Sequence, residues 1–306
     1  MSDIKLFQVQ GDKAINLSGL PFNLEKELQD TVEKHMDVML KMRFVASEHS
    51  TGKNHAGRID SLALDENGCP VIIEYKRNAN ANVINQGLYY LDWLLDHKAE
   101  FEMLILKKYG QEVVDSVDWT GPRLLCIAQD FNKYDAHAVQ QINRNIELIQ
   151  YIHYPDGFLA LNLVNAVSTD PLSLDDSPTK TAKGAKVQYK TITEYMAQLS
   201  DEVKGIYEEA REYMLDLGDD VLEKELKYYI AFRRMKNFVT VQCAPTKGSL
   251  YFYLNLNPDT VDLEKDFSSD LRKVGHQGTG DLELKILSMQ DLEKAKPLIK
   301  RSFEEN

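Results

Sequence analysis

The sequence has few cysteines, no long apolar run and no excess of positive charge. Its 306 residues include three cysteines, Cys69, Cys126 and Cys243, which lie far apart in mostly apolar surroundings, so we expect reduced core thiols. No Cys-x-x-Cys or His-x-x-x-His pair is present, which argues against a structural zinc site. The net charge of −12 argues against a surface coated in positive charge for nonspecific nucleic-acid binding, although a local basic groove would suffice.

Membrane and nucleotide-binding signals are also missing. No run approaches the ~18 apolar residues of a membrane span, and the N-terminal MSDIKLFQVQGDK lacks the apolar stretch of a signal peptide. We therefore expect a cytoplasmic protein without membrane contact. Gly52-Lys53 is not a Walker A motif, because the preceding glycine pattern and the following Ser or Thr are absent.

A shift in composition divides the chain into two parts. Residues 166–191, AVSTDPLSLDDSPTKTAKGAKVQYKT, are rich in Ser, Thr, Pro, Asp and Lys and have hardly any periodic apolar positions. This composition is typical of a linker. It predicts a first domain of residues 1–165 and a second domain of residues 192–306.

Hydrophobic periodicity in the first part predicts alternating helices and strands. After a short hairpin, the expected elements are a helix over 23–41, strands at 43–48, 57–64 and 70–77, a helix over 80–97, a strand at 101–106, a helix near 107–116, a strand at 123–129, a helix over 135–146 and strands at 147–154 and 158–164. The core order α-β-β-β-α-β predicts an α/β fold with one mixed sheet covered by helices.

The second part has an α+β pattern. We expect helices over 193–217 and 219–227, then strands in RMKNFVTVQCAP and SLYFYLNL, and a closing helix over 289–304. The spacing of its residues alone indicates no chemistry.

Three charged residues occupy the predicted hairpin GRIDSLALDENGCPVIIEYKR. Glu74 and Lys76 lie two positions apart on one strand and therefore share a face of the sheet, while Asp60 lies on the preceding strand. A two-residue turn would place Asp60 opposite Tyr75, on the other face. A three-residue loop with Gly68 in the left-handed conformation would place Asp60 opposite Glu74. We predict the second register.

Two adjacent carboxylates repel each other, so both remain ionised only if a nearby cation offsets the repulsion. Hard oxygen ligands of this kind suit Mg²⁺ or Mn²⁺. Lys76 could also supply the compensating charge by itself, in a simple structural ion pair. Beside a metal, its ammonium would be placed to stabilise phosphate charge.

Asp60 followed by Glu74-Tyr75-Lys76 resembles the D…ExK signature of the PD-(D/E)xK nuclease superfamily, and the predicted α-β-β-β-α-β order resembles its restriction-endonuclease-like core. The sequence pattern GRID…VIIEYKR…NQGLYYLDWL is similar to that of the NucS-like endonuclease branch over about residues 20–95. This resemblance implies hydrolysis of phosphodiester bonds in DNA with Mg²⁺ or Mn²⁺ as cofactor.

The resemblance also implies a role for each matched residue. Asp60 and Glu74 would bind the metal, and an acid on the N-terminal helix would add a further ligand. That acid falls on Glu27, with Glu33 as the less favoured choice. Lys76 would position the attacking water and stabilise the phosphorus centre, and Gln86 would orient Lys76 or contact the backbone.

Other residues near this hairpin are candidates for contact with nucleic acid. The resemblance extends to Gly57-Arg58, so Arg58 is expected to touch phosphate, and Tyr90 lies one helical turn after Gln86. Lys53 and Arg77 would join Lys76 in a small basic rim around the acidic centre. A solvated run of charges is the competing interpretation. His49 and His55 lie in the loop SEHSTGKNHAG, near enough in sequence to act as acid or base, although such loop histidines are more often only exposed to solvent.

The second part resembles a small uncharacterised domain found in nuclease and defence-type proteins, through GHQGTGD and the strands before it. That resemblance brings no assigned activity. A basic patch that faces nucleic acid, with two tyrosines for stacking, is one interpretation, and a plain basic strand edge is the other. The residues of this patch would be Arg233, Arg234, Lys236, Lys247, Tyr251 and Tyr253.

The sequence thus predicts a metal-dependent DNA endonuclease with an α+β accessory domain. The alternatives are a noncatalytic nucleic-acid-binding or interaction module that retains the fold, and a structural or regulatory protein unrelated to nucleic acid. A homodimer would fit the enzyme, because cutting both strands of a duplex needs two sites. The second domain could also bind a protein partner.

Overall fold

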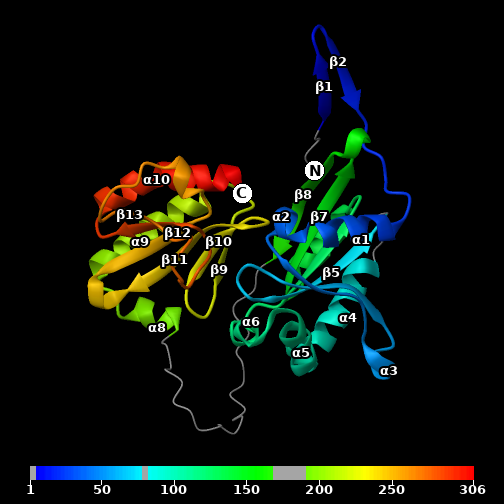
Figure 1. The fold of residues 1–306 in the computed structure, drawn as a ribbon, viewed down its shortest axis with the longest axis horizontal. Coiled ribbons are helices and arrows are strands. Elements are labelled where there is room, and N and C mark those ends of the chain that lie inside the picture. Colours follow the sequence, from blue (N-terminus) through cyan, green and yellow to red (C-terminus); the bar gives the residue numbers. More distant parts are fainter. Residues whose placement is uncertain (1–4, 78–81, 168–190) are drawn as a thin grey trace. The chain divides into compact units, whose positions relative to one another are not determined.

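The computed structural model describes residues 5–77, 82–167 and 191–306. The chain divides into two compact units, one within residues 1–117 and 122–169 and the other within residues 118–121 and 170–306 (Figure 1). The last strand of the first unit includes Ala166 and Val167, and Thr191 caps the first helix of the second unit. The centre of the expected linker, residues 168–190, lies outside the described residues.

The first unit contains eight strands and seven α-helices among its described residues. In chain order they are β1 Leu6–Gln10, β2 Lys13–Leu17, α1 Glu25–Lys34, α2 Met36–Leu40, β3 Arg43–Ser50, α3 Gly52–His55, β4 Arg58–Leu64, β5 Pro70–Lys76, α4 Asn82–Asp96, α5 Lys98–Tyr109, α6 Gln111–Asp115, β6 Arg123–Ala128, α7 Lys133–Gln140, β7 Asn145–His153 and β8 Leu159–Val167.

One mixed six-stranded sheet forms the core of this unit, in the order β3-β4-β5-β6-β7-β8. The β5–β6 and β6–β7 pairs are parallel, and the other three pairs are antiparallel. The central strands β5 and β6 are almost wholly buried, as their near-continuous apolar sequences require for strands covered on both faces. The α/β fold class and the α-β-β-β-α-β core are thereby confirmed.

Helices α1 and α4 cover opposite faces of the central strands. Tyr75 faces α1, because its hydroxyl meets the Ser61 hydroxyl at 3.2 Å and Ser61 donates to Glu33 of α1. Glu74 therefore points to the α4 face. On that face α4 approaches very closely, since a Cβ added to Gly87 would lie 2.4 Å from Leu124 Cδ1. The β5 strand end thus lies between two helices.

The β4–β5 hairpin has the predicted three-residue register. Leu64 pairs with Pro70 and Ser61 with Ile73, which places Asp60 opposite Glu74. Gly68 has the left-handed φ of 79°, and its amide donates to the Asp65 carbonyl at 3.0 Å. The Asp65 carboxylate stabilises the turn by accepting hydrogen bonds from the amides of residues 67 and 69. The buried Arg123 guanidinium lies 3.3 Å from Asp65 Oδ2.

Two local expectations for this unit are wrong. The segment FEMLIL, expected as a strand, lies inside helix α5, where Phe101 and Ile105 are buried one helical turn apart. An apolar run of this length fits either element, and its tertiary packing selects the helix. The helix expected over 23–41 is two helices, because the chain breaks at His35.

The second unit contains six strands and three α-helices among its described residues. They are α8 Ile192–Ala197, α9 Asp201–Leu215, β9 Leu222–Glu225, β10 Ile230–Arg233, β11 Asn237–Ala244, β12 Ser249–Leu254, β13 Ser268–Asp270, β14 Leu282–Ile286 and α10 Met289–Glu305. The segment expected as a helix over 219–227 contains strand β9 and no helix, so that expectation is wrong.

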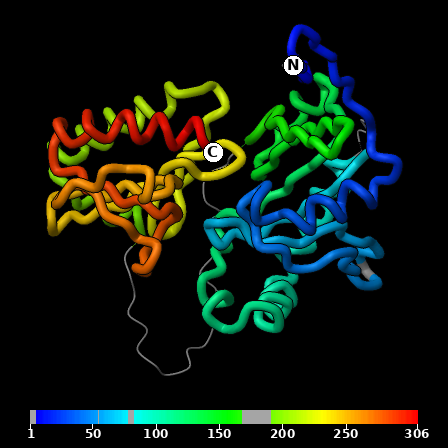
Figure 2. The backbone as a smooth tube through the Cα atoms, turned by 45° about the horizontal axis from the view of Figure 1, so that its top comes forward, coloured from blue at the N-terminus to red at the C-terminus, as the bar shows by residue number. Residues whose placement is uncertain are grey.

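The six strands form one antiparallel sheet, in the order β13-β14-β12-β11-β10-β9. One face packs against α8, α9 and α10 around a single apolar cluster that includes Val241, Phe252 and Leu284. Figure 2 traces α10, in red, along this sheet. The unit therefore has the α+β architecture that the sequence predicts, and its three described α-helices pack on one face of the sheet.

The hairpin β1–β2 forms a separate two-stranded sheet. Most of its apolar side chains are exposed, with Val9 at 70% and Phe7 at 52%. Among the described residues, no helix is long and apolar enough to cross a bilayer.

Candidate active site

The structure brings Asp60 and Glu74 together at the end of the β4–β5 hairpin. Asp60 Oδ2 accepts a hydrogen bond from the Tyr75 amide at 3.0 Å, and Glu74 Oε1 accepts one from the Asp60 amide at 3.2 Å. Each carboxylate is thus held by the backbone of the opposite strand. Glu74 is wholly buried, and its second oxygen, Oε2, accepts no hydrogen bond from the described residues.

Burial and mutual repulsion keep protons on this pair. Burial, followed by the charge of Asp60, raises the pKa of Glu74 to about 9. Burial also raises the pKa of Asp60, against the opposing effects of the Tyr75 amide and the Lys76 charge. Without a metal ion, and despite the nearby Lys76 ammonium, the pair therefore retains at least one proton at neutral pH, because it is costly to remove two carboxylate charges from water.

Lys76 lies beside the carboxylates and is held by an acid from α1. Its Nζ is 2.9 Å from Glu25 Oε1. Burial lowers the pKa of Lys76, but the hydrogen bond and charge of Glu25 and the charges of Asp60 and Glu74 outweigh it, so that the pKa is raised. Lys76 is therefore a fixed ammonium next to two carboxyls.

The acids of α1 divide between two faces of the helix. Glu25, Gln29 and Glu33 repeat every four residues and share one face. Gln29 Nε2 donates to the Asp60 carbonyl at 2.8 Å, and Glu33 Oε1 accepts from Ser61 at 2.6 Å. This stripe supports the strand that carries Asp60.

Glu27 lies on a different face of α1 and does not join Asp60 and Glu74. Its Oε2 accepts from the amides of Asn23 at 3.2 Å and Leu24 at 3.4 Å, so it caps the start of its own helix. The exposed position of Glu27 follows from helix phase, because 27 is two residues from the stripe. Glu25, which our interpretation of the sequence missed, is the acid of α1 that contacts Lys76. The four-residue spacing from Gln29 was the available signal.

Gln86 and Tyr90 form a polar link between α4 and β4. Gln86 Nε2 donates to the Tyr90 hydroxyl at 3.2 Å, and that oxygen also accepts from the Arg58 amide at 3.2 Å. The Tyr90 ring is 6% exposed and lies where a Cβ on Gly57 would be 2.5 Å away. Tyr90 is therefore positioned to hold the chain two residues before Asp60.

The three basic residues expected around the site are exposed, but two of them already have partners. Arg58 forms an ion pair with Glu48. Arg77 Nη1 donates to the Asn23 carbonyl at 2.9 Å, and its amide donates to Glu25 Oε2 at 3.2 Å. Lys53 projects from the short helix α3. The guanidinium groups of Arg58 and Arg77 are thus oriented by these contacts.

The two loop histidines belong to an aromatic cluster. His49 Nε2 is 3.1 Å from Glu100 Oε1, and its ring lies 5.3 Å from the Trp93 ring. The His55 ring lies 5.0 Å from that of Tyr89. Among the described residues, no hydrogen bond or ring contact joins either histidine to Asp60 or Glu74.

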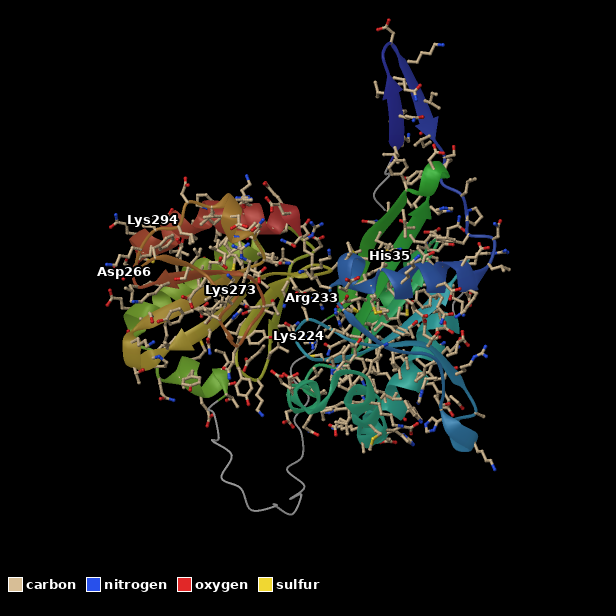
Figure 3. All side chains as sticks on the ribbon, in the orientation of Figure 1. His35, Lys224, Arg233, Asp266, Lys273 and Lys294 are labelled. Atoms are coloured by element: carbon tan, nitrogen blue, oxygen red, sulfur yellow. The ribbon has the colours of Figure 1, made fainter. Side chains whose placement is uncertain are left out.

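In the second unit, the expected basic patch is only partly present. Arg233 is buried on β10 (Figure 3), and Arg234 forms an ion pair with Asp220 at 2.7 Å. Lys247 instead lies 5.7 Å from the centre of the Tyr251 ring. On β12, Tyr253 is also buried, whereas Tyr251 is half-buried.

Within residues 5–77, 82–167 and 191–306, no group of three or more His, Cys, Asp or Glu side chains converges as a ready metal cage. Asp60 and Glu74 are a pair, and Glu25 reaches this pair through Lys76. Any metal held here would complete its shell with backbone oxygen, substrate or water.

Comparisons with known proteins match the chain in parts and as a whole. Residues 192–306 match a family described as a domain of unknown function, DUF5655. An uncharacterised protein from Haemophilus influenzae is 28% identical over 307 aligned residues, which cover 99% of this chain and 100% of that protein.

Two solved structures also align with about half of the chain. A repair endonuclease from Pyrococcus abyssi matches 48% of this chain and 64% of its own, with a TM-score of 0.29 and 13% identity. The EndoMS-dsDNA2 complex matches 47% of this chain and 49% of its own, with a TM-score of 0.26 and 14% identity.

Proposed function

We propose that this protein is a metal-dependent nuclease that hydrolyses phosphodiester bonds in DNA. One observation carries the proposal. Two carboxyls, Asp60 and Glu74, meet across a hairpin at a buried strand end, with the ammonium of Lys76 beside them. A structural ion pair would need only one carboxylate for that lysine, and Glu25 already supplies it.

The carboxyl pair fits Mg²⁺ or Mn²⁺. Asp60 and Glu74 would hold the ion, since both offer hard oxygens and Glu74 Oε2 is buried with no hydrogen-bond donor among the described residues. Such an ion would replace the proton that the pair otherwise keeps. When bound, it would supply Lewis-acid stabilisation of phosphate charge and acidify a water molecule.

The protein's own residues would orient this chemistry. The Tyr75 amide and the backbone of Asp60 hold the two carboxylates in place. Lys76 would stabilise the negative charge that develops on the phosphate, and Glu25 would keep its ammonium aimed and protonated. Gln86 would act at one remove, through Tyr90 and the Arg58 amide.

The direct test is cleavage of labelled oligonucleotides with Mg²⁺ or Mn²⁺. Single-stranded, duplex and branched DNA, and RNA of matched sequence, would be incubated with wild type, Glu74→Gln and Lys76→Met. We expect each variant to lose roughly a thousandfold in rate, since about 4 kcal/mol of transition-state stabilisation is removed.

Glu112→Gln, on the exposed surface of α6, is the matched control for loss of one carboxylate. Equal cleavage by wild type and both site variants would refute the site. Binding of DNA without cleavage under any metal would support the noncatalytic module instead. Faster cleavage of RNA than of DNA would correct the substrate, which rests on the sequence resemblance.

Assembly follows from the same proposal. Cutting both strands of a duplex needs two sites, so we propose a homodimer on duplex DNA, and sedimentation of the protein with and without DNA would test it. A protein partner for the second unit is a further proposal. Capture of a defined partner that is lost on deletion of residues 192–306 would support it.

A further inference from the structure

A cavity of about 490 Å³ lies on the second unit, on the face of the sheet away from the helices. The pairing of β11, β12 and β14 places Gln242, Tyr251 and Lys285 in one row and Thr240, Tyr253 and Glu283 in the next. These residues alternate with the buried apolar ones, so they share the opposite face. The cavity has the volume of a ligand pocket.

The loop of residues 271–281 forms one wall of this cavity and is tied to the sheet. Thr279 exchanges hydrogen bonds with the Thr240 hydroxyl at 3.0 and 3.1 Å. Gly278 and Gly280 have positive φ, and a Cβ on Gly280 would lie 2.6 Å from the Leu254 backbone. This wall therefore depends on backbone that only glycine fits without strain.

An ordered polar chain crosses the cavity. The Tyr253 hydroxyl donates to Gln242 Oε1 at 2.8 Å, and Gln242 Nε2 donates to Gln277 Oε1 at 3.1 Å. The His276 ring lies 4.9 Å from the Tyr253 ring, and its buried Nε2 has no hydrogen-bond partner in the described residues. The side-chain amides of Gln242 and Gln277 and the imidazole of His276 are thus fixed next to the Tyr253 ring.

The cavity holds charged groups of both signs. Lys247 lies over Tyr251, and Glu283 interacts electrostatically with His276, Lys247 and Lys285. Burial raises the pKa of Glu283, against the opposing charges of those three residues. A bare anion would be repelled by this carboxylate. A ligand with N–H donors on a flat ring and a phosphate at its edge would satisfy both signs.

We propose that this cavity binds one unpaired nucleobase of a nucleic-acid strand. The base stacks on Tyr251, its N–H edge meets Glu283 and the Gln277 amide, and its phosphate meets Lys247. The choice of nucleic acid among flat heterocycles rests on the nuclease function proposed above. The cavity would then select strands with an exposed base.

The test is binding of fluorescein-labelled 12-nucleotide strands to the full chain in EDTA, followed by anisotropy. The strands are single-stranded DNA, single-stranded RNA and blunt duplex DNA. We expect tighter binding of single strands than of duplex, and a roughly tenfold loss in Tyr251→Ala with little loss in Tyr251→Phe. Lys247→Ala would lower the salt dependence by about one phosphate contact.

Tyr134→Ala is the matched control, because Tyr134 of α7 is 71% exposed and has Lys133 5.1 Å from its ring centre. Photocrosslinking of wild type to a strand with one 5-iodouracil would place the base, and we expect the crosslink within residues 245–254. A crosslink elsewhere, or equal affinity of Tyr251→Ala and Tyr134→Ala, would overturn the proposal. Failure of cleavage with this binding intact would overturn only the nuclease proposal.

Discussion

Two six-stranded sheets place polar residues in opposite environments. In the first unit, helices on both faces enclose the end of β5, so Glu74 is wholly buried. In the second unit, helices cover one face, and Gln242, Tyr251 and Glu283 line an open cavity on the other. Enclosure raises the free-energy cost of an ionised carboxylate such as Glu74, so a bound cation would stabilise it. Polar side chains on the open face keep more of their hydration and remain accessible to a ligand. The number of covered faces therefore sets how far each sheet removes its polar side chains from water.

The largest expected effect is the pH dependence of the free energy of unfolding, which buried Glu74 causes in the first unit. Because the folded pKa of Glu74 is about 9 and its ordinary value is 4.5, the native state holds an extra proton between these values. The free energy of unfolding of the metal-free protein should therefore fall as pH rises from about 4.5 to about 9, by at most about 1.4 kcal/mol per pH unit. Urea unfolding in EDTA would measure this.

Glu74→Gln removes the titrating group, so it should flatten this dependence and make the metal-free protein more stable than wild type at pH 8. Glu283→Gln is the counterpart on the open face and should change the pH dependence much less. Equal slopes for wild type and Glu74→Gln would break the contrast between the two sheets.

Divalent ions should stabilise the first unit, through Asp60 and Glu74, and not the second unit. At a hundredfold excess over its dissociation constant, Mn²⁺ would add about 2.7 kcal/mol to the free energy of unfolding. Asp60→Asn and Glu74→Gln should abolish this gain, since each removes one of the two carboxylates. Calorimetric titration with MnCl₂ would measure the binding itself, and unchanged affinity in both variants would place the ion elsewhere.

The wall of the open cavity should be sensitive to backbone change. Gly280→Ala should lower stability by about 1–3 kcal/mol, because Gly280 has φ of +116° and its new Cβ would meet the Leu254 backbone. Gly275→Ala is the matched control in the same loop, since nothing lies within 4 Å of its Cβ position. Thermal unfolding of both variants would measure the difference. Similar losses would show that the loop does not depend on Gly280.

The smallest effects distinguish two acids on one helix. Glu25→Ala should reduce cleavage roughly tenfold by releasing Lys76. It should also move the alkaline limb of the pH–rate profile to lower pH, because the charge of Glu25 helps to raise the pKa of Lys76. Glu27→Ala should lower stability by about 1 kcal/mol through its lost helix cap and leave the cleavage rate unchanged. The reverse outcome would restore Glu27 to the site.

Much of the first fold follows from local signals. Alternation, a glycine at the left-handed turn position and a near-continuous apolar strand predicted the β4–β5 hairpin and its register, which the structure confirms. FEMLIL and the 219–227 segment were misassigned because short apolar or charged runs fit either element. Neither run contains the contacts that select its conformation.

By itself, the sequence determined that Asp60, Glu74 and Lys76 share one end of one hairpin, because strand alternation and turn length are local properties. Only the tertiary structure decided that Glu25, and not Glu27, meets Lys76, because the answer depends on where α1 begins and how it is rotated against the sheet. The burial of Glu74 and the cavity beside Tyr251 were decided in the same way. Both depend on which helices and loops pack over each sheet, and residues far apart in the chain set that packing.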